Sequence, residues 1–158
     1  MATLDRICIS TKKGTVKKPI PEARMIAGHG IDGDAHAGDW HRQVSLLASE
    51  SIAGVRKVLP DLVDGAFAEN FITTGVDWAR AVTVGDLVRV GESVVMEVTQ
   101  IGKECHTNCA IGVATGDCIM PREGVFCRVL EGGLVRPGDT LVHEPVAVRI
   151  DDPQEMES

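Results

Sequence analysis

The stretch Val82–Gln100, VTVGDLVRVGESVVMEVTQ, decides the fold. It has the highest density of strand-forming residues in the chain, and β-branched side chains favour the pleated, half-buried surface of a strand. Gly91-Glu92 divides it into the runs Val82–Val90 and Ser93–Gln100, and a short polar break between two such runs predicts a hairpin. The stretch therefore predicts two paired antiparallel strands.

Similar runs lie on both sides of this hairpin, ended by Gly, Pro or polar residues. They are Leu4–Ser10, Ala23–Ala27, Gln43–Ala48, Val125–Leu130, Leu134–Val142 with a turn at Pro137-Gly138-Asp139, and Val146–Ile150. In Ser51–Leu59 the apolar residues repeat with a helical period instead, and we expect Ser49 or Ser51 to cap this helix and Pro60 to end it. Many short strands with one or two short helices predict a mainly β fold, either a barrel or a sandwich.

Length and charge restrict the kind of protein. The 158 residues suit a single domain over residues 1–150, followed by an acidic tail, 151–158, that we expect to be disordered. With 16 Lys and Arg against 23 Asp and Glu the net charge is −7, which argues against nucleic acid as a partner. No apolar run approaches the roughly 18–20 residues of a membrane helix, and Asp5 and Arg6 interrupt any signal peptide. We therefore expect no membrane partner and a cytoplasmic location.

Two segments without regular periodicity hold most of the chemically active residue types. The first, Gly28–Arg42, contains four Gly, three His and three Asp. Such a segment either binds a metal or a polar ligand, or forms a turn whose carboxylates accept hydrogen bonds from backbone N–H groups.

The second segment, Lys103–Arg122, contains three of the five cysteines, Cys105, Cys109 and Cys118. Lys103 and His106 flank Cys105, and nearby positive charge favours a thiolate, which attacks sulfur or binds a soft metal. The same cysteines are open to two other interpretations, a structural zinc site and a redox pair, although their spacing fits neither a zinc ribbon nor Cys-x2-Cys. Cys8 and Cys127 stand inside apolar runs and are predicted to be small buried residues.

Two smaller features complete the candidates. Glu69-Asn70 offers an acceptor and an amide to a polar ligand, or else ends a strand with a solvated Glu. Six of the first 24 residues are basic, and they form either a solvated rim or a local patch that attracts an anion such as phosphate. These residues are Arg6, Lys12, Lys13, Lys17, Lys18 and Arg24.

Taken together, and in their order along residues 1–142, these motifs resemble the MOSC domain family, the C-terminal domain of molybdenum cofactor sulfurases, in its small stand-alone bacterial form. The matching pieces are Gly-Ile-Asp-Gly-Asp-Ala-His (30–36), Arg42-Gln43-Val44-Ser45-Leu46-Leu47, Glu69-Asn70 with Gly75, Val84-Gly85-Asp86, Val90-Gly91, Val98-Thr99-Gln100 leading to Cys105, Val129-Leu130-Glu131-Gly132-Gly133 and Pro137-Gly138-Asp139.

The resemblance implies a strongly bent, barrel-like β fold that binds the molybdenum cofactor (molybdopterin), and the family also carries molybdenum-ion and pyridoxal-phosphate labels. It implies that Cys105 carries sulfur or ligates molybdenum, assisted by His106 and Lys103. Lys17 or Lys18, with Arg24, would contact the cofactor phosphate. The other cofactor-binding residues implied are Gly33, Asp34, His36, Arg42, Glu69 and Asn70.

The leading hypothesis is therefore a module that binds the cofactor and carries sulfur during its maturation or delivery. Its partners would be a cysteine desulfurase-type sulfur donor and a molybdoenzyme or cofactor-biosynthesis protein. Two alternatives stay open: a cofactor-dependent reductase of N-hydroxylated compounds, and a structural zinc or redox domain built on Cys105, Cys109 and Cys118.

Overall fold

The computed structural model describes residues 2–13, 15–102 and 124–146, and within them the chain is mainly β with one short helix. The elements are β1 (Ala2–Ile9), β2 (Lys18–Ile20), β3 (Ala23–Ile26), β4 (Gly30–Ile31), β5 (Val44–Ala48), α1 (Ser49–Arg56), β6 (Phe71–Thr74), β7 (Leu87–Val90), β8 (Val94–Ile101), β9 (Val125–Glu131), β10 (Gly133–Val135) and β11 (Thr140–Glu144).

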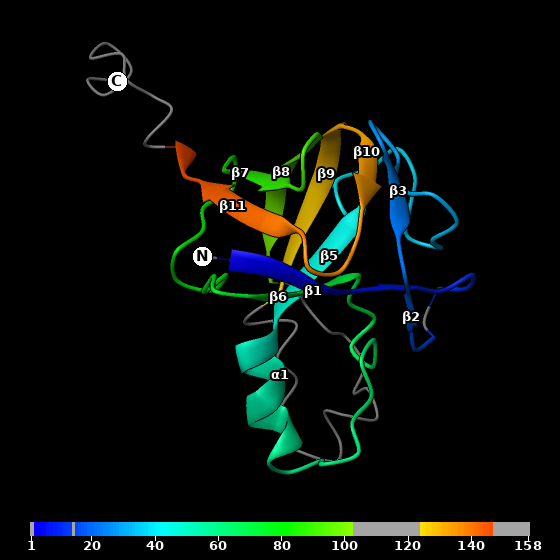
Figure 1. Cartoon of the computed structure of the whole chain (residues 1–158), viewed down its shortest axis with the longest axis vertical. Helices are drawn as coiled ribbons and strands as arrows, with labels where there is room; N and C mark the ends of the chain where they lie inside the picture. The colour runs from blue at the N-terminus through cyan, green and yellow to red at the C-terminus, as the bar shows by residue number, and fades with distance from the viewer. Residues whose placement is uncertain (1, 14, 103–123, 147–158) are drawn as a thin grey trace.

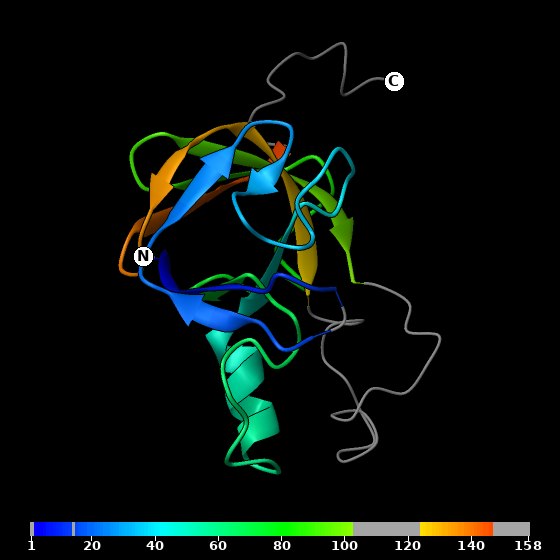
Figure 2. The same cartoon turned by 90° about the vertical axis from the view of Figure 1, so that its right-hand side faces the viewer.

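Seven strands close into a barrel in the order β11-β7-β8-β9-β5-β6-β1. The ring closes because β1 also pairs with β11, with Ala2 opposite Leu141 and Thr3 opposite Thr140. Figure 1 shows the strands gathered into one body with α1 projecting below it, and Figure 2 shows the same body from the side. The mainly β prediction is confirmed, and the architecture is the barrel and not the sandwich.

The hairpin predicted from Val82–Gln100 is present, but its first strand is shorter than expected. β7 pairs with β8 from Leu87 opposite Glu97 to Val90 opposite Val94. The preceding residues form a turn in which Gly85 has a φ of 99°. The carboxylate of Asp86 accepts a hydrogen bond from the Thr83 amide at 2.9 Å. The strand therefore begins only at Leu87, because Gly85 in the left-handed region and the turn-forming Asp86 precede it.

The helix is explained by the direction of its neighbouring strands. β5 and β6 pair in parallel, with Leu46 opposite Phe71, and a parallel pair needs a crossover connection. α1 lies in that connection, at the predicted place, but it begins two residues earlier and ends three earlier than expected. The predicted serine cap is wrong: the N-cap is Ala48, without a side-chain cap hydrogen bond, because Ser49 Oγ lies instead 2.7 Å from Thr74 Oγ1.

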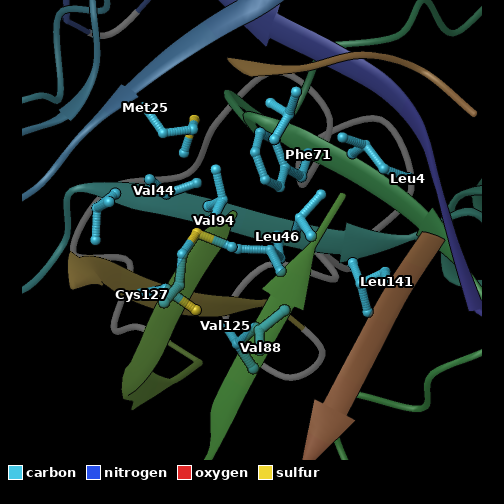
Figure 3. Close-up of a cluster of buried hydrophobic side chains, with 14 of the residues drawn as sticks. Leu4, Met25, Val44, Leu46, Phe71, Val88, Val94, Val125, Cys127 and Leu141 are labelled. Atoms are coloured by element: carbon cyan, nitrogen blue, oxygen red, sulfur yellow. The ribbon is translucent and has the colours of Figure 1, made fainter. Parts of the chain in front are cut away.

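The interior of the barrel is filled by apolar side chains from all seven of its strands, and Met25 of β3 packs with them. Figure 3 shows ten of them, labelled, pointing toward one another. They are Leu4, Met25, Val44, Leu46, Phe71, Val88, Val94, Val125, Cys127 and Leu141.

A second apolar cluster covers the outside of the barrel wall. It joins Ile52 of α1 to Leu47 of β5 and Ile72 of β6, and it includes Cys8, Phe67 and Phe126. All five residues of β5 are buried because Val44, Leu46 and Ala48 face the interior while Leu47 faces this cluster. A strand covered on both faces reads as a nearly continuous apolar run, and in Val44–Ala48 only Ser45 interrupts it.

A small sheet, in the order β10-β3-β4, lies beside the barrel. This sheet positions the beginning of the Gly28–Arg42 segment, because β4, which lies in that segment, pairs with β3 with Met25 opposite Ile31. No helix in the described part of the chain is long and apolar enough to cross a membrane. The predicted strand Val146–Ile150, apart from its first residue, and the tail 151–158 lie outside the described residues.

Candidate functional site

A small pocket on the barrel wall brings together three of the predicted cofactor-binding residues, His36, Arg42 and Asn70. Its volume is about 20 Å³, which is room for about one water molecule. The remaining lining residues are Ser45 of β5, Phe67 and Ala68 of the connection before β6, and Phe126 of β9. Segments separated by tens of residues in the sequence therefore meet at one polar pocket with aromatic walls.

Arg42 is the cation of this pocket. Its guanidinium carbon lies 5.3 Å from the ring centre of Phe126, and its Nε donates a hydrogen bond to Gln100 Oε1 at 3.0 Å. His41 Nε2 lies 2.9 Å from the same oxygen. Arg42 makes no ion pair with a carboxylate of residues 2–13, 15–102 or 124–146. No carboxylate of these residues neutralises the guanidinium, and a cation of this kind suits an anionic ligand.

Gln100 reaches Arg42 because β8 is irregular at this point. The register between β8 and β9 shifts between Val98 and Gln100, so that Thr99 is the extra residue of a bulge. Thr99 Oγ1 donates hydrogen bonds to the carbonyls of Phe126, at 3.1 Å, and of His41. A bulge redirects the side chains of its strand, and here it places the amide oxygen of Gln100 against the pocket cation.

Asn70 holds the pocket wall together. Its Oδ1 accepts hydrogen bonds from the backbone N–H of Ser45 at 2.9 Å and from Ser45 Oγ at 3.2 Å. Its Nδ2 donates to the carbonyl of Cys8 at 3.0 Å, and the side chain is fully buried. The amide thereby links β5 to β1, and its role in the described residues is to shape the pocket.

Glu69 points away from the pocket into its own turn. The carboxylate accepts hydrogen bonds from the Gly65 amide at 3.0 Å and the Phe67 amide at 2.9 Å. Burial raises the pKa of Glu69 more than these backbone hydrogen bonds lower it. The solvated Glu at a strand end, one of the two sequence readings, is wrong, because Glu69 is fully buried.

Lys17 and Asp34 are paired with each other. Lys17 Nζ lies 2.7 Å from Asp34 Oδ1, and both side chains are fully buried. Asp34 also accepts hydrogen bonds from the amides of Ser10, at 3.1 Å, and His36, at 3.2 Å. The sequence alternative in which an Asp of the Gly28–Arg42 segment accepts backbone N–H groups is therefore realised at Asp34. Gly33, just before it, has a φ of 88°, which a glycine adopts without strain.

His36 belongs to a row of rings along the pocket edge. It stacks on Trp40 with ring centres 6.5 Å apart, and Trp40 Nε1 donates to the His36 carbonyl at 2.7 Å. Lys13 Nζ lies 5.2 Å from the centre of the Trp40 ring. A basic side chain from the N-terminal segment thus contacts the aromatic ring that stacks on His36.

The other predicted basic residues do not line this pocket. Lys18 is exposed on β2 and, with Lys12, lines a separate surface pocket of about 370 Å³. Arg24 is exposed on β3, opposite Leu134 of β10.

The predicted thiol residues, Lys103, Cys105 and His106, together with Cys109 and Cys118, lie outside the described residues. The two cysteines predicted to be buried, Cys8 and Cys127, are buried free thiols, as expected. Burial raises the pKa of Cys8 to about 12 and that of Cys127 further, so neither is a thiolate at neutral pH. Within the described ranges no three His, Cys, Asp or Glu side chains gather as metal ligands.

Sequence reasoning missed Gln100, Ser45 and Phe126, and it also missed Phe67 of the pocket lining. Gln100 and Ser45 entered only as parts of matching motifs, and Phe126 was only a strand residue. Their roles depend on which strands pair and in which register, and the residue types around them do not by themselves show which side chains will meet. A polar side chain at the end of a strongly apolar strand, as Gln100 is, was the one available hint.

Comparisons with known proteins identify the family of the chain and structures that share its fold. The MOSC domain family matches residues 32–142, which is more than half of the chain and includes Arg42 and Asn70. None of the curated proteins compared with the chain is similar enough to count as a match.

Solved structures share the fold. The YuaD protein from Bacillus subtilis superposes with a TM-score of 0.75 at 18% identity, over 90% of this chain and 96% of that one. YiiM from Geobacillus stearothermophilus has a TM-score of 0.65 at 19% identity, over 90% of this chain and 75% of its own. YiiM from Escherichia coli has a TM-score of 0.64 at 19% identity, over 90% of this chain and 69% of its own. At these identities the likeness concerns the fold alone, whereas the family match rests on the sequence itself. The chain therefore belongs to the MOSC domain family, which is known in molybdenum cofactor-related proteins.

Proposed function

We propose that this protein binds the molybdenum cofactor beside the pocket of His36, Arg42 and Asn70 and handles sulfur at Cys105. The observation that supports this most is the position and the hydrogen bonding of the Arg42 guanidinium. The guanidinium lines a polar pocket, is held at Nε by Gln100, and has no carboxylate partner within the described residues. A cation placed in this way suits an anionic group such as a phosphate, for which charge-assisted hydrogen bonds are strongest.

The size of the pocket limits what it would hold. With about 20 Å³ it has room for one small polar group and not for a pterin ring system. One anionic end of the cofactor would contact Arg42 and His36, and the rest would lie over the pocket mouth. Asn70 would contribute indirectly, because its side-chain atoms are already bonded to Ser45 and Cys8.

Cys105 is the proposed sulfur residue. It follows Gly102, the last described residue of that segment, by three positions, and a chain spans at most roughly 3.6 Å per residue. Gly102 in turn accepts a hydrogen bond from Gln100 Nε2 at 2.7 Å, so the chain leaves the barrel next to the partner of Arg42. Lys103 and His106 flank the cysteine in the sequence and would favour its thiolate.

The chemistry required of this residue is a sulfur transfer. The Cys105 thiolate would attack the outer sulfur of a donor persulfide, forming a Cys105 persulfide and releasing the donor thiolate. The donor would be a cysteine desulfurase-type protein in the cytoplasm, and the recipient a molybdoenzyme or cofactor-biosynthesis protein. Molybdenum in the bound cofactor would supply a centre that accepts soft sulfur donors.

The first experiment measures cofactor binding. Reduced wild-type protein is mixed with molybdenum cofactor released from a molybdoenzyme, and bound molybdenum and pterin are quantified after gel filtration. Wild type is expected to retain both, and Arg42→Gln to weaken binding about tenfold or more, because it removes the charge-assisted contacts. Arg80→Gln is the matched control, since it removes an exposed arginine on the connection after β6. Wild type that retains no pterin, or equal losses in both variants, would refute the proposal.

The second experiment concerns Cys105. Wild type is incubated with a cysteine desulfurase and cysteine, and its mass is measured before and after treatment with a reductant. A reducible gain of one sulfur atom, absent in Cys105→Ser and retained in Cys109→Ser, is expected. A gain that persists in Cys105→Ser would move the carrier role to another thiol.

A further inference from the structure

The buried Lys17–Asp34 pair is not part of the pocket lining. Lys17 Nζ bonds to Asp34 at 2.7 Å and to Ser10 Oγ at 3.2 Å, and neither Lys17 nor Asp34 is among the residues that line the pocket. Both side chains are fully buried, so no ligand reaches them without displacing the pair. This arrangement differs from the phosphate contact that Lys17 was expected to make.

Each member of the pair holds one wall of the pocket. Asp34 accepts the hydrogen bond of the His36 amide at 3.2 Å and so fixes the segment that carries His36. The Lys17 backbone amide donates to the Gly65 carbonyl at 3.0 Å, at the start of the turn that ends in Ala68 and Asn70. The contact is close: a Cβ on Gly65 would lie 1.9 Å from the Lys17 carbonyl oxygen.

We infer that Lys17 and Asp34 are positioning residues, a buried brace that sets the separation of the His36 wall and the Ala68–Asn70 wall of the pocket. The identity of the ligand in the pocket rests on the proposed function, whereas the brace rests on the contacts of Lys17 and Asp34 described above. The contacts to anions are then left to Arg42 and His36, and Lys17 contributes no charge to the ligand.

The two possible roles of Lys17 make opposite predictions for a paired substitution. Removing one member of a buried ion pair leaves the other uncompensated, which is strongly unfavourable, whereas replacing both by neutral groups is often close to neutral. If the pair is a brace, the double variant Lys17→Met/Asp34→Asn should regain most of the amide protection and cofactor affinity that Lys17→Met loses. If Lys17 instead contacts the cofactor phosphate directly, the double variant should bind the cofactor as weakly as Lys17→Met does.

The first measurement needs no ligand. Amide hydrogen exchange of the full chain is followed for Lys17→Met, Asp34→Asn, the double variant and Ser10→Ala. Ser10→Ala removes the Nζ–hydroxyl contact together with the hydrogen bond from that hydroxyl to the Lys12 carbonyl, and it leaves the Lys17–Asp34 ion pair in place. The single variants are expected to raise exchange at the amides of Ser10, Lys17 and His36 about tenfold or more, and the double variant to restore most of the protection. Lys18→Met, at the exposed neighbouring position, should leave exchange unchanged. Val88→Ala, in the barrel core, controls for a general loss of stability that would raise exchange everywhere.

The second measurement uses the released cofactor as the probe, at a temperature at which every variant is folded. Lys17→Met should weaken binding about tenfold and the double variant should recover most of it, while the dependence of affinity on salt stays as in wild type. Arg42→Gln should reduce that salt dependence, because it removes a charge that contacts the ligand. A double variant no better than Lys17→Met in both measurements would overturn the brace. Wild type that binds no cofactor would overturn the proposed function and leave the exchange result to decide the brace.

Discussion

Asn70 shows how much of this fold depends on one uncharged side chain. It is fully buried, and every polar atom of its amide is bonded to Ser45 or to the Cys8 carbonyl. Because the Ser45 N–H and the Cys8 carbonyl are backbone groups of two strands, a side chain at position 70 must both accept and donate a hydrogen bond to satisfy them.

Asn70→Ala is therefore expected to lower the free energy of unfolding by about 2–4 kcal/mol, since it leaves a buried N–H and a buried carbonyl without partners. Urea denaturation followed by circular dichroism measures the change. Ser93→Ala, whose hydroxyl is exposed and makes one long contact to the Gly132 carbonyl at 3.4 Å, should change stability by less than about 0.5 kcal/mol. Equal effects would show that the Asn70 amide is not a structural link.

Asp86 gives the protein a defined response to acid. Burial by itself would raise the pKa of its carboxyl, but the hydrogen bond from His143 at 2.7 Å and those from the Thr83 and Val146 amides hold the pKa below its ordinary value. The folded state thus favours the ionised form. Its stabilising contribution is present above the ordinary pKa of about 3.9 and is lost as the pH falls through the lowered folded value.

The prediction is a pH-dependent difference between wild type and Asp86→Asn. The difference in free energy of unfolding should be fully developed at about pH 5 and should shrink progressively below about pH 4. Urea titrations at a series of pH values measure it. A difference that is the same at pH 3 and pH 5 would mean that the charge of Asp86 does not contribute.

At the scale of elements, α1 is the crossover that lets β5 and β6 lie parallel, and it also covers the outer wall behind the pocket. Ile52 is its buried residue, and it packs in the cluster that contains Phe67 and Phe126, two residues of the pocket lining. The helix therefore supports the pocket from behind, although it supplies no residue to it.

Ile52→Ala should lower the free energy of unfolding by about 2–4 kcal/mol, because it removes buried methyl groups and leaves a cavity. Val58→Ala, just after the helix at a position 62% exposed, should change it by less than about 0.5 kcal/mol. Thermal or urea unfolding provides both values. If Ile52→Ala proved as mild as Val58→Ala, the helix would not be docked as described.

At the scale of the whole molecule, the small sheet β10-β3-β4 and the barrel meet through a close backbone contact. Gly132, between β9 and β10, lies so near Met25 of β3 that a Cβ added to it would be 2.4 Å from the Met25 carbonyl oxygen. Because a backbone atom cannot move aside as a flexible side chain can, this position requires glycine for space.

Gly132→Ala is expected to destabilise the protein by about 1–3 kcal/mol, as overpacking usually does. Gly54→Ala, in α1, is the matched control and should stabilise the protein. Nothing lies within 4 Å of a Cβ added there, and alanine is more favourable than glycine in a helix by about 0.5–1 kcal/mol. Melting temperatures of the two variants should therefore move to opposite sides of wild type. A lower melting temperature for both would contradict the free space at Gly54.

The sequence by itself determined the class of the fold, because strand content, turns and the helical period are local patterns. The hairpin of Val82–Gln100, the apolar run of β5 and the place of α1 all follow from neighbouring residue types, and the ordered motifs identified the family. The errors were local as well: Gly85 and Asp86 shortened one strand, and the serine next to the helix start turned to Thr74.

Only the tertiary structure decided which predicted residues meet. Arg42 and Asn70 share a pocket, Glu69 turns into its own loop, and Lys17 pairs with Asp34 instead of standing in the pocket. Glu69 finds its partners within four residues, whereas Arg42 meets Gln100 across 58 positions of the chain, because strand pairing and a bulge in β8 bring them together. The sequence shows the charge and the hydrogen-bonding groups of each residue. Its partner across the sheet depends on which strands pair and in which register, and that pairing joins segments distant in the chain.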